Sequence, residues 1–351
     1  MKSIIEIEGK KVGIGQPCFI IGEIGSNHCL DKKVVKGLID ASSDAGFDAV
    51  KFQIYDAKEA FSANEMTTDV KMEHLYGIRP WWEVARDKIL MPRDWFGEMF
   101  EYARSKDLIP FSTIHRPEDA EFLLQYALPI FKIASIDLHY HYLFKQLIPF
   151  KKPFLVSTGM AYLSEIEETM RMLKSEGCNQ VILMHCVSCY PPRPEDTNLR
   201  NITTFQNAFE LPVGYSDHSP ENVSAIAAVT LGATVVEKHI TLDKNAHGPD
   251  HPFALEPNGM KQLVNAIREI EVSLGHSKRT LSKSELHIRK MVRRSIITKS
   301  PIPKGEAVNL DKIKFARPGT GISTNEFKYI DGRKVNRNIQ PETILQWDMF
   351  D

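Results

Sequence analysis

Residues 181–186, with the sequence VILMHC, form a short run that is apolar except for His185. Seven further runs of this kind occur between residues 18 and 240: residues 18–22 (CFIIG), 49–54 (AVKFQI), 109–113 (IPFST), 130–135 (IFKIAS), 154–158 (FLVST), 212–216 (PVGYS) and 234–240 (TVVEKHI). Nearly continuous apolar character is typical of strands that are buried on both faces, as in a parallel sheet. The runs therefore predict eight parallel strands.

Segments with apolar residues at three- and four-residue spacing separate most of these runs and predict helices: residues 34–45, 95–106, 117–126, 163–176, 220–231 and 257–274. Eight strands alternating with helices over about 260 residues is the pattern of an α/β protein with a (β/α)8 TIM barrel. The alternative is a doubly wound open sheet, which usually has fewer strands and often a G-x-G-x-x-G loop. The sequence contains no such loop. We predict a TIM-barrel domain at residues 1–275.

Three segments depart from the alternating pattern. Residues 4–14 contain the turn sequence Glu8-Gly9-Lys10 and predict a hairpin that plugs the amino-terminal end of the barrel. Residues 55–88 form a long insert, for which we expect a lid or an interface. Beyond residue 275 the sequence predicts a linker at residues 276–290 and a small, loop-rich domain at residues 291–351.

Composition restricts the class of protein. The 351 residues include 44 Lys and Arg against 45 Asp and Glu, so there is no basic surplus for nucleic acid or an anionic membrane. No apolar run approaches the roughly 18 residues that span a bilayer, and the first residues lack a signal-peptide core. The five cysteines are few and odd in number, which favours a reducing compartment. We therefore expect a cytoplasmic enzyme acting on small molecules.

Polar residues at the ends of the predicted strands indicate the site, because the carboxyl ends of barrel strands face it. They are Glu23, Lys51, Gln53, Ser112, Thr113, Lys132, Ser135, Ser157, Thr158, His185, Asp217, His218, Glu237 and His239. Two lysines with several hydroxyls predict a pocket for a phosphate or carboxylate. In the alternative interpretation, each lysine pairs with Glu23, Asp137 or Glu237 and only holds the barrel together.

Histidine and cysteine add two further hypotheses. His218 and His239 end adjacent strands, so with Glu23 or Asp217 they predict an open divalent-metal site; alternatively, each imidazole is only hydrogen-bonded. Cys186 and Cys189 form a C-x-x-C without a second pair, and we interpret them as buried thiols. His139 and His141 are expected in a surface or rim loop.

Several motifs occur in a fixed order: Glu23-Ile24-Gly25-Ser26-Asn27-His28, Lys51-Phe52-Gln53, Phe131-Lys132-Ile133-Ala134-Ser135, Ser157-Thr158-Gly159-Met160, His185-Cys186-Val187-Ser188-Cys189-Tyr190-Pro191, Gly214-Tyr215-Ser216-Asp217-His218-Ser219, Glu237-Lys238-His239-Ile240-Thr241-Leu242-Asp243 and Gly248-Pro249-Asp250-His251. In these motifs the chain closely resembles the sialic acid (N-acetylneuraminate) synthase family, which includes legionaminate and pseudaminate synthases. Its tail, with Arg317-Pro318-Gly319-Thr320-Gly321, resembles the antifreeze-like (SAF, β-clip) domain of that family.

The resemblance implies a transferase that condenses phosphoenolpyruvate with N-acetylmannosamine, or a related N-acetylated hexosamine, giving a nonulosonic acid and phosphate. It implies Mn²⁺, Mg²⁺ or Co²⁺ at His218 and His239, and a domain-swapped homodimer in which Arg317 reaches the neighbour's site. The implied catalytic residues are Glu23, Lys51, Lys132 and Asp137. The implied substrate-binding residues are Gln53, Thr113, Ser135, Ser157, Ser188, Tyr190, Ser216, Asp250 and Arg317.

Two positions depart from the family pattern. Ala134-Ser135-Ile136-Asp137 stands where the family often has G-S-G-E or G-S-G-D, and Cys29-Leu30 stands where a glycine often follows Asn-His. The sequence Gly248-Pro249-Asp250-His251 favours the neuraminate and legionaminate branches. Alternatives are a legionaminate or pseudaminate synthase acting on a diacetamido-6-deoxyhexose, a Schiff-base aldolase using Lys51 or Lys132, and a non-catalytic sugar-binding protein.

Overall fold

The computed structural model describes residues 2–351 and divides into two compact units, the first ending at Gly275 and the second comprising His276–Asp351. The first unit is a closed barrel of eight parallel strands, in which the last strand pairs with the first. The strands are β3 (Phe19–Glu23), β4 (Ala49–Gln53), β5 (Ile109–Thr113), β6 (Phe131–Ile133), β7 (Phe154–Ser157), β8 (Val181–Cys186), β9 (Val213–Asp217) and β10 (Val235–His239). The predicted TIM barrel is confirmed, and the closure of the sheet excludes the open-sheet alternative.

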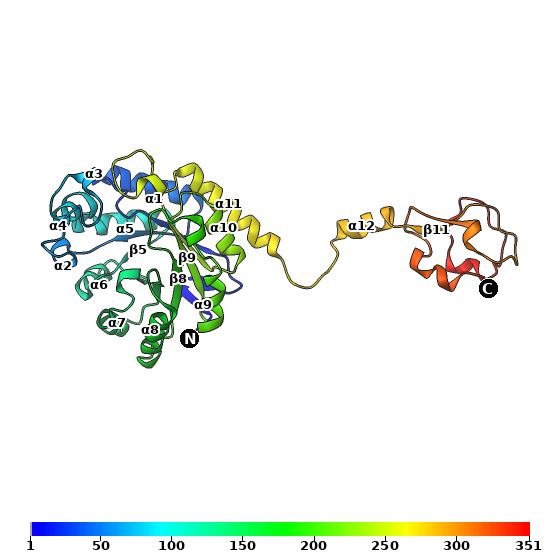
Figure 1. Ribbon diagram of the computed structural model, residues 1–351, viewed down its shortest axis with the longest axis horizontal. Helices are drawn as coiled ribbons and strands as arrows, with labels where there is room; N and C mark the ends of the chain where they lie inside the picture. The colour runs from blue at the N-terminus through cyan, green and yellow to red at the C-terminus, as the bar shows by residue number, and fades with distance from the viewer. Residues whose placement is uncertain (1) are drawn as a thin grey trace. The chain divides into compact units, whose positions relative to one another are not determined.

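Helices surround the barrel (Figure 1). They are α1 (Lys32–Ala45), α5 (Phe96–Ser105), α6 (Pro117–Leu124), α7 (His141–Leu147), α8 (Leu163–Ser175), α9 (Asn201–Phe209), α10 (Val223–Thr230) and α11 (Pro257–Leu274). Helices α7 and α9 have no counterpart among the helices predicted from the sequence. It was also wrong to place His141 in a loop, since this residue begins α7 and its Nε2 lies 3.2 Å from the hydroxyl of Thr169.

Burial of apolar faces holds each helix against the strands. In α1, for example, Asp31 caps the amino terminus by accepting a hydrogen bond from the backbone N–H of Lys33, and Val35, Leu38 and Ile39 are buried. The aromatic rings of Phe52 on β4 and of Phe96 and Phe100 on α5 pack together between this strand and this helix. Such rings each remove a large apolar area from water, so this layer stabilises the β4–α5 side of the barrel.

The predicted amino-terminal hairpin is present as β1 (Ile4–Ile7) and β2 (Lys10–Gly13), paired antiparallel. Its residues Ile5, Ile7 and Val12 join the barrel core. Lys10 pairs with Asp48, just before β4, at 2.6 Å. The hairpin therefore packs against the amino-terminal end of the barrel, opposite the end where sites form in this fold.

The insert after β4 contains short helices: α2 (Ala57–Ala60), α3 (Glu73–Tyr76), α4 (Trp81–Val84) and the π-helical η1 (Ala85–Ile89). Its aromatic rings contact residues at the carboxyl end of the barrel: Tyr55 packs on His115 at 5.5 Å between ring centroids, and Tyr76 packs on His247 at 5.3 Å. The insert thus lies on the side of the barrel where loops build the site. A role as lid or interface stays a prediction.

The second unit has its own apolar core, which includes Ile296, Val308 and Leu345. Its elements are α12 (Lys283–Val292), β11 (Ser295–Thr298), β12 (Ile313–Ala316) and several short 3-10 helices, of which η8 (Thr324–Tyr329) is the longest. Helix α12 occupies much of the segment for which we predicted a linker, and Ser282 and Glu285 form a capping box at its start. Within residues 2–351, no helix is both long and apolar enough to cross a membrane.

Candidate active site

A cavity of about 310 Å³, called the barrel cavity below, opens at the carboxyl ends of the strands. It brings together thirteen of the residues predicted for the site: Glu23, Lys51, Gln53, Thr113, Lys132, Ser135, Ser157, Ser188, Tyr190, Ser216, His218, Glu237 and His239. These residues are far apart in the sequence and come together because all eight strands run in the same direction.

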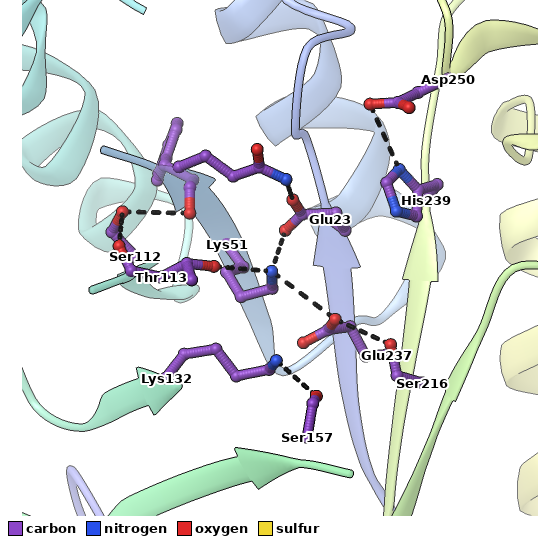
Figure 2. Close-up of polar contacts among 12 residues, drawn as sticks. Glu23, Lys51, Ser112, Thr113, Lys132, Ser157, Ser216, Glu237, His239 and Asp250 are labelled. Atoms are coloured by element: carbon purple, nitrogen blue, oxygen red, sulfur yellow. Dashed lines mark hydrogen bonds and ion pairs between the residues drawn. The ribbon is translucent and has the colours of Figure 1, made fainter. Parts of the chain in front are cut away.

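Lys51 lies between two carboxylates in the barrel cavity (Figure 2). Its Nζ is 2.7 Å from Oε2 of Glu23 and 3.5 Å from Oε1 of Glu237, and it donates a hydrogen bond of 3.1 Å to the hydroxyl of Thr113. Lys51 therefore forms the lysine–carboxylate ion pair that was the alternative to anion binding in the sequence-based prediction. All three charged side chains are at most 5% exposed, so the charges interact with little screening by solvent.

Lys132 differs from Lys51 in having no carboxylate within ion-pair distance among the described residues. It donates a hydrogen bond of 2.7 Å to the hydroxyl of Ser157 (Figure 2). Burial lowers the pKa of Lys132, and the more distant Glu237 opposes that shift. A buried ammonium without a direct counter-ion is costly, and an anionic ligand would supply the missing charge.

Gly159 lets two hydroxyl groups and one thiol group gather in the wall of the barrel cavity. A Cβ at this position would lie 2.3 Å from Oγ of Ser188, 2.8 Å from Oγ of Ser135 and 3.0 Å from Sγ of Cys186. The backbone N–H of Gly159 donates to the hydroxyl of Ser135 at 3.0 Å. Only glycine allows this approach, and it leaves a wall of small polar groups suited to an oxyanion.

The two buried glutamates have different acidities. Burial raises the pKa of Glu23, and Glu237 adds to this effect, while Lys51 opposes it. Burial would also raise the pKa of Glu237, but Lys132 and Lys51 together lower it. Glu237 therefore serves as a permanent carboxylate, whereas Glu23 takes up a proton more readily. From the sequence, Glu237 was predicted only as a strand-end residue and a possible ion-pair partner of a lysine.

His218 and His239 lie side by side, with ring centroids 5.6 Å apart. The Nδ1–H of His218 donates to the carbonyl of Val187 at 2.8 Å, so Nε2 carries the lone pair, 3.4 Å from the hydroxyl oxygen of Ser216. Nδ1 of His239 is buried without a hydrogen bond and is 3.8 Å from Oδ2 of Asp250. Burial lowers the pKa of both imidazoles, that of His218 to about 4, so both are neutral near pH 7.

The fit to a metal ion is partial. Within residues 2–351 no group of three or more His, Cys, Asp or Glu side chains is arranged to hold one. Two neutral imidazoles, one with an orphaned buried nitrogen, suit an open site completed by water or substrate. The suggestion that Asp217 contributes is wrong: its Oδ2 is 2.7 Å from Nζ of Lys238, and both side chains are fully buried outside the cavity lining.

Four of the predicted strand-end residues are not in the cavity lining: Ser112, Thr158, His185 and Asp217. Of the residues to which the resemblance gave roles, three are also outside it. Asp137 accepts a hydrogen bond of 2.7 Å from Nδ1 of His115, which does line the cavity. Asp250 accepts a hydrogen bond of 2.7 Å from the hydroxyl of Ser26. Arg317 is exposed and follows β12 in the second unit. The assigned roles of all three stay predictions.

Other lining residues were missed or misjudged. His115 lies two residues beyond the end of β5, outside the strand ends on which the prediction relied. Ile136 and Met160 also line the cavity and are 60% and 67% exposed.

All five cysteines are free. Cys186 is buried as expected, but Cys189 is exposed, so the buried-thiol interpretation is wrong for Cys189.

The closed barrel, with buried carboxylates and ammonium groups in a cavity at the carboxyl ends of its strands, is the arrangement of a TIM-barrel enzyme. The chain belongs to the NeuB family, whose model matches residues 38–279. The SAF domain model matches residues 293–351.

Similar proteins support this assignment over nearly the whole chain. The N,N'-diacetyllegionaminic acid synthase of Legionella pneumophila is 33% identical over 97% of this chain and 96% of its own length. The crystal structure of the spore coat polysaccharide biosynthesis protein SpsE of Bacillus subtilis covers 99% of both chains with a TM-score of 0.67 and 34% identity. That of the N-acetylneuraminic acid synthetase of Leptospira borgpetersenii, in complex with citrate, covers 82% of this chain and 95% of its own, with a TM-score of 0.72 and 32% identity.

Proposed function

We propose that this protein is a nonulosonic acid synthase, which condenses phosphoenolpyruvate with an N-acetylated hexosamine and releases phosphate. N-acetylmannosamine is the first acceptor to test. The observation that carries the proposal is the buried ammonium of Lys132, which has no carboxylate at ion-pair distance within residues 2–351, donates to the hydroxyl of Ser157 and shares the barrel cavity with Ser135. This cluster suits the phosphate or carboxylate of phosphoenolpyruvate. Membership of the NeuB family supports the same reaction.

The reaction begins with attack of C3 of phosphoenolpyruvate on the aldehyde carbon of the open-chain sugar. A C–C bond forms, the aldehyde oxygen takes up a proton, and C2 becomes an oxocarbenium-like centre. Water adds to C2, and the C–O bond to phosphate then breaks to give a 2-keto acid. Glu23 is suited to stabilise the cationic centre or accept the proton of the attacking water, because it is buried and basic enough to do so.

Other side chains hold the reactants in place. Lys51, held between Glu23 and Glu237, presents its positive charge to the same cavity as Lys132. Gln53 donates to Oε1 of Glu23 at 2.6 Å, which fixes that carboxyl group. Fixed positions of this kind lower the reorganisation needed in the transition state.

His218 and His239 are the residues that would hold a divalent ion. When bound there, such an ion would act as a Lewis acid on the aldehyde oxygen. The proposal predicts that His239→Ala weakens Mn²⁺ binding at least about tenfold while the circular dichroism spectrum is unchanged. Binding is read by electron paramagnetic resonance of Mn²⁺, independently of turnover, with His141→Ala as control. If His239→Ala bound Mn²⁺ as tightly as the wild type, His218 and His239 would not be the metal ligands.

A second acceptor class has specific support. Ile136 and Met160 place exposed apolar surface in the cavity lining, which suits methyl groups such as those of a diacetamido-6-deoxyhexose. The relative from Legionella pneumophila is named as a diacetyllegionaminic acid synthase. The proposal therefore includes legionaminate synthesis as the alternative.

The proposal also includes a domain-swapped homodimer and a cytoplasmic location, both as predicted from the sequence.

The test measures phosphate release from phosphoenolpyruvate with Mn²⁺ and either N-acetylmannosamine or its 2,4-diacetamido-6-deoxy analogue. Acceptor-dependent release that stops on chelation is the expected result, and the faster acceptor identifies the branch. Borohydride trapping with pyruvate tests the Schiff-base alternative at Lys51 or Lys132. A trapped lysine adduct, or folded protein that binds sugar without releasing phosphate, would contradict the proposal.

A further inference from the structure

His115 and Asp137 form a polar pair at the side of the barrel cavity, on the loops that follow β5 and β6. Nδ1 of His115 and Oδ2 of Asp137 are 2.7 Å apart, and the side chains are only 16% and 13% exposed. Because a carboxylate oxygen accepts, Nδ1 carries the proton and donates it to Asp137. Nε2 is then an acceptor, and it has no hydrogen-bond partner within the described part of the chain. His115 lines the cavity and Asp137 does not.

The long insert fixes the imidazole from its other side. The ring of Tyr55 packs edge-on against His115, with 5.5 Å between centroids and an interplanar angle of 86°. Tyr55 packs in turn on Phe61, and Phe61 on Trp81, at 5.7 and 6.1 Å. The ring of His115 is therefore held by a hydrogen bond and by aromatic packing. Such preorganisation is what a ligand-binding group requires.

Charge indicates which reactant this side of the cavity receives. Asp137 places a carboxyl group beside His115, and a carboxylate repels phosphate and carboxylate groups at short range. The cations suited to phosphoenolpyruvate, Lys51 and Lys132, donate instead to Thr113 and Ser157. A neutral ligand rich in hydroxyl and amide N–H donors matches an imidazole acceptor.

We propose that His115 binds the acceptor sugar, with Nε2 accepting a hydrogen bond from a hydroxyl or amide group, and that Asp137 is a positioning residue that fixes its tautomer. This inference rests on the proposed function and adds a residue that determines affinity for the sugar. It also gives the insert a role, since Tyr55 supports the binding group. Asp137 acts through His115 rather than on the reacting atoms.

The experiment compares steady-state kinetics of His115→Gln, Asp137→Asn and the double variant with the wild type, varying each substrate separately. We expect the acceptor KM to rise about 5- to 10-fold in each single variant, the scale of one lost hydrogen bond, with the KM for phosphoenolpyruvate changed less than about twofold. The double variant should be no worse than His115→Gln, because both changes remove one interaction. His141→Gln, a hydrogen-bonded histidine outside the cavity lining, is the matched control.

Equal increases in both KM values, an effect on phosphoenolpyruvate alone, or additive losses in the double variant would overturn the inference. Unchanged kinetics in His115→Gln would do the same while leaving the proposed function standing. The rise in melting temperature caused by phosphoenolpyruvate shows whether each variant is folded, and it should equal that of the wild type. If the wild type itself released no phosphate with any acceptor, the proposed function would fail, and this inference with it.

Discussion

Nζ of Lys51 lies 2.7 Å from Oε2 of Glu23 inside a barrel cavity where both side chains are almost completely buried. The pair joins β3 to β4, whose residues Glu23 and Lys51 are also partners in the strand register. It has a structural role because each charge compensates the other, and it places both groups where a substrate would bind. Variants of this pair should therefore separate stability from catalysis.

Lys51→Met should lower the free energy of unfolding by about 3 kcal/mol, because it leaves Glu23 and Glu237 buried without their nearest cation. Adding Glu23→Gln removes one of those charges and should restore most of the stability but none of the phosphate release. Urea unfolding followed by circular dichroism measures the first effect. A double variant that regained activity would show that the pair has only a structural role.

Lys132→Met should leave the melting temperature unchanged or higher, because the ammonium of Lys132 is buried and residues 2–351 place no carboxylate at ion-pair distance from it. It should also abolish the rise in melting temperature that phosphoenolpyruvate causes in the wild type. The matched control is Lys238→Met, which removes a buried lysine paired with Asp217 and should destabilise the fold by about 3 to 5 kcal/mol. Retention of the full phosphoenolpyruvate effect in Lys132→Met would contradict the anion site.

Arg317→Ala should raise the acceptor KM much more than that for phosphoenolpyruvate, if the second unit of one protomer completes the site of its partner as proposed. The exposed Arg337, which pairs with Asp348 in the same unit, provides a control substitution to alanine. Mixing Arg317→Ala protein with a protein inactivated at Lys132 should restore some activity when subunits exchange. Equal effects on both KM values would count against a role on the sugar side.

Stability should decrease as the pH falls from 6.5 to 4 because of His28. Its Nε2–H donates to the carbonyl of Ile89 at 2.9 Å, and burial lowers its pKa to about 4. Between these pH values the unfolded chain binds a proton that the folded chain does not, so stability is complete above pH 6.5 and is lost on acidification. The loss amounts to about 3 kcal/mol at pH 4.

Urea unfolding across this pH range should show a smaller acid-induced loss in His28→Gln than in the wild type. The exposed His74 in the insert, changed to Gln, provides the control and should follow the wild type. Identical pH profiles for His28→Gln and the wild type would show that another group causes the acid-induced loss.

Much of the barrel could be predicted because parallel strands leave a strong local signal. Runs such as residues 181–186 coincide with β8, and polar residues at strand ends converge once the barrel closes. Features that depend on side-chain direction or on loops were harder to predict from the sequence. Asp217 was misjudged because pairing with Lys238 is visible only in three dimensions. His115 was missed because it lies beyond the strand end, where periodicity gives no information.

The proposed reaction condenses phosphoenolpyruvate with an N-acetylated hexosamine in the barrel cavity and breaks the C–O bond to phosphate. The most direct test supplies phosphoenolpyruvate labelled with ¹⁸O in the bridging oxygen, together with Mn²⁺ and the faster acceptor, and analyses both products by mass spectrometry. Cleavage of the C–O bond predicts that the ¹⁸O is recovered in phosphate and that the new keto acid carries oxygen from water at C2. Recovery of the label in the keto acid, which indicates P–O cleavage, would contradict it.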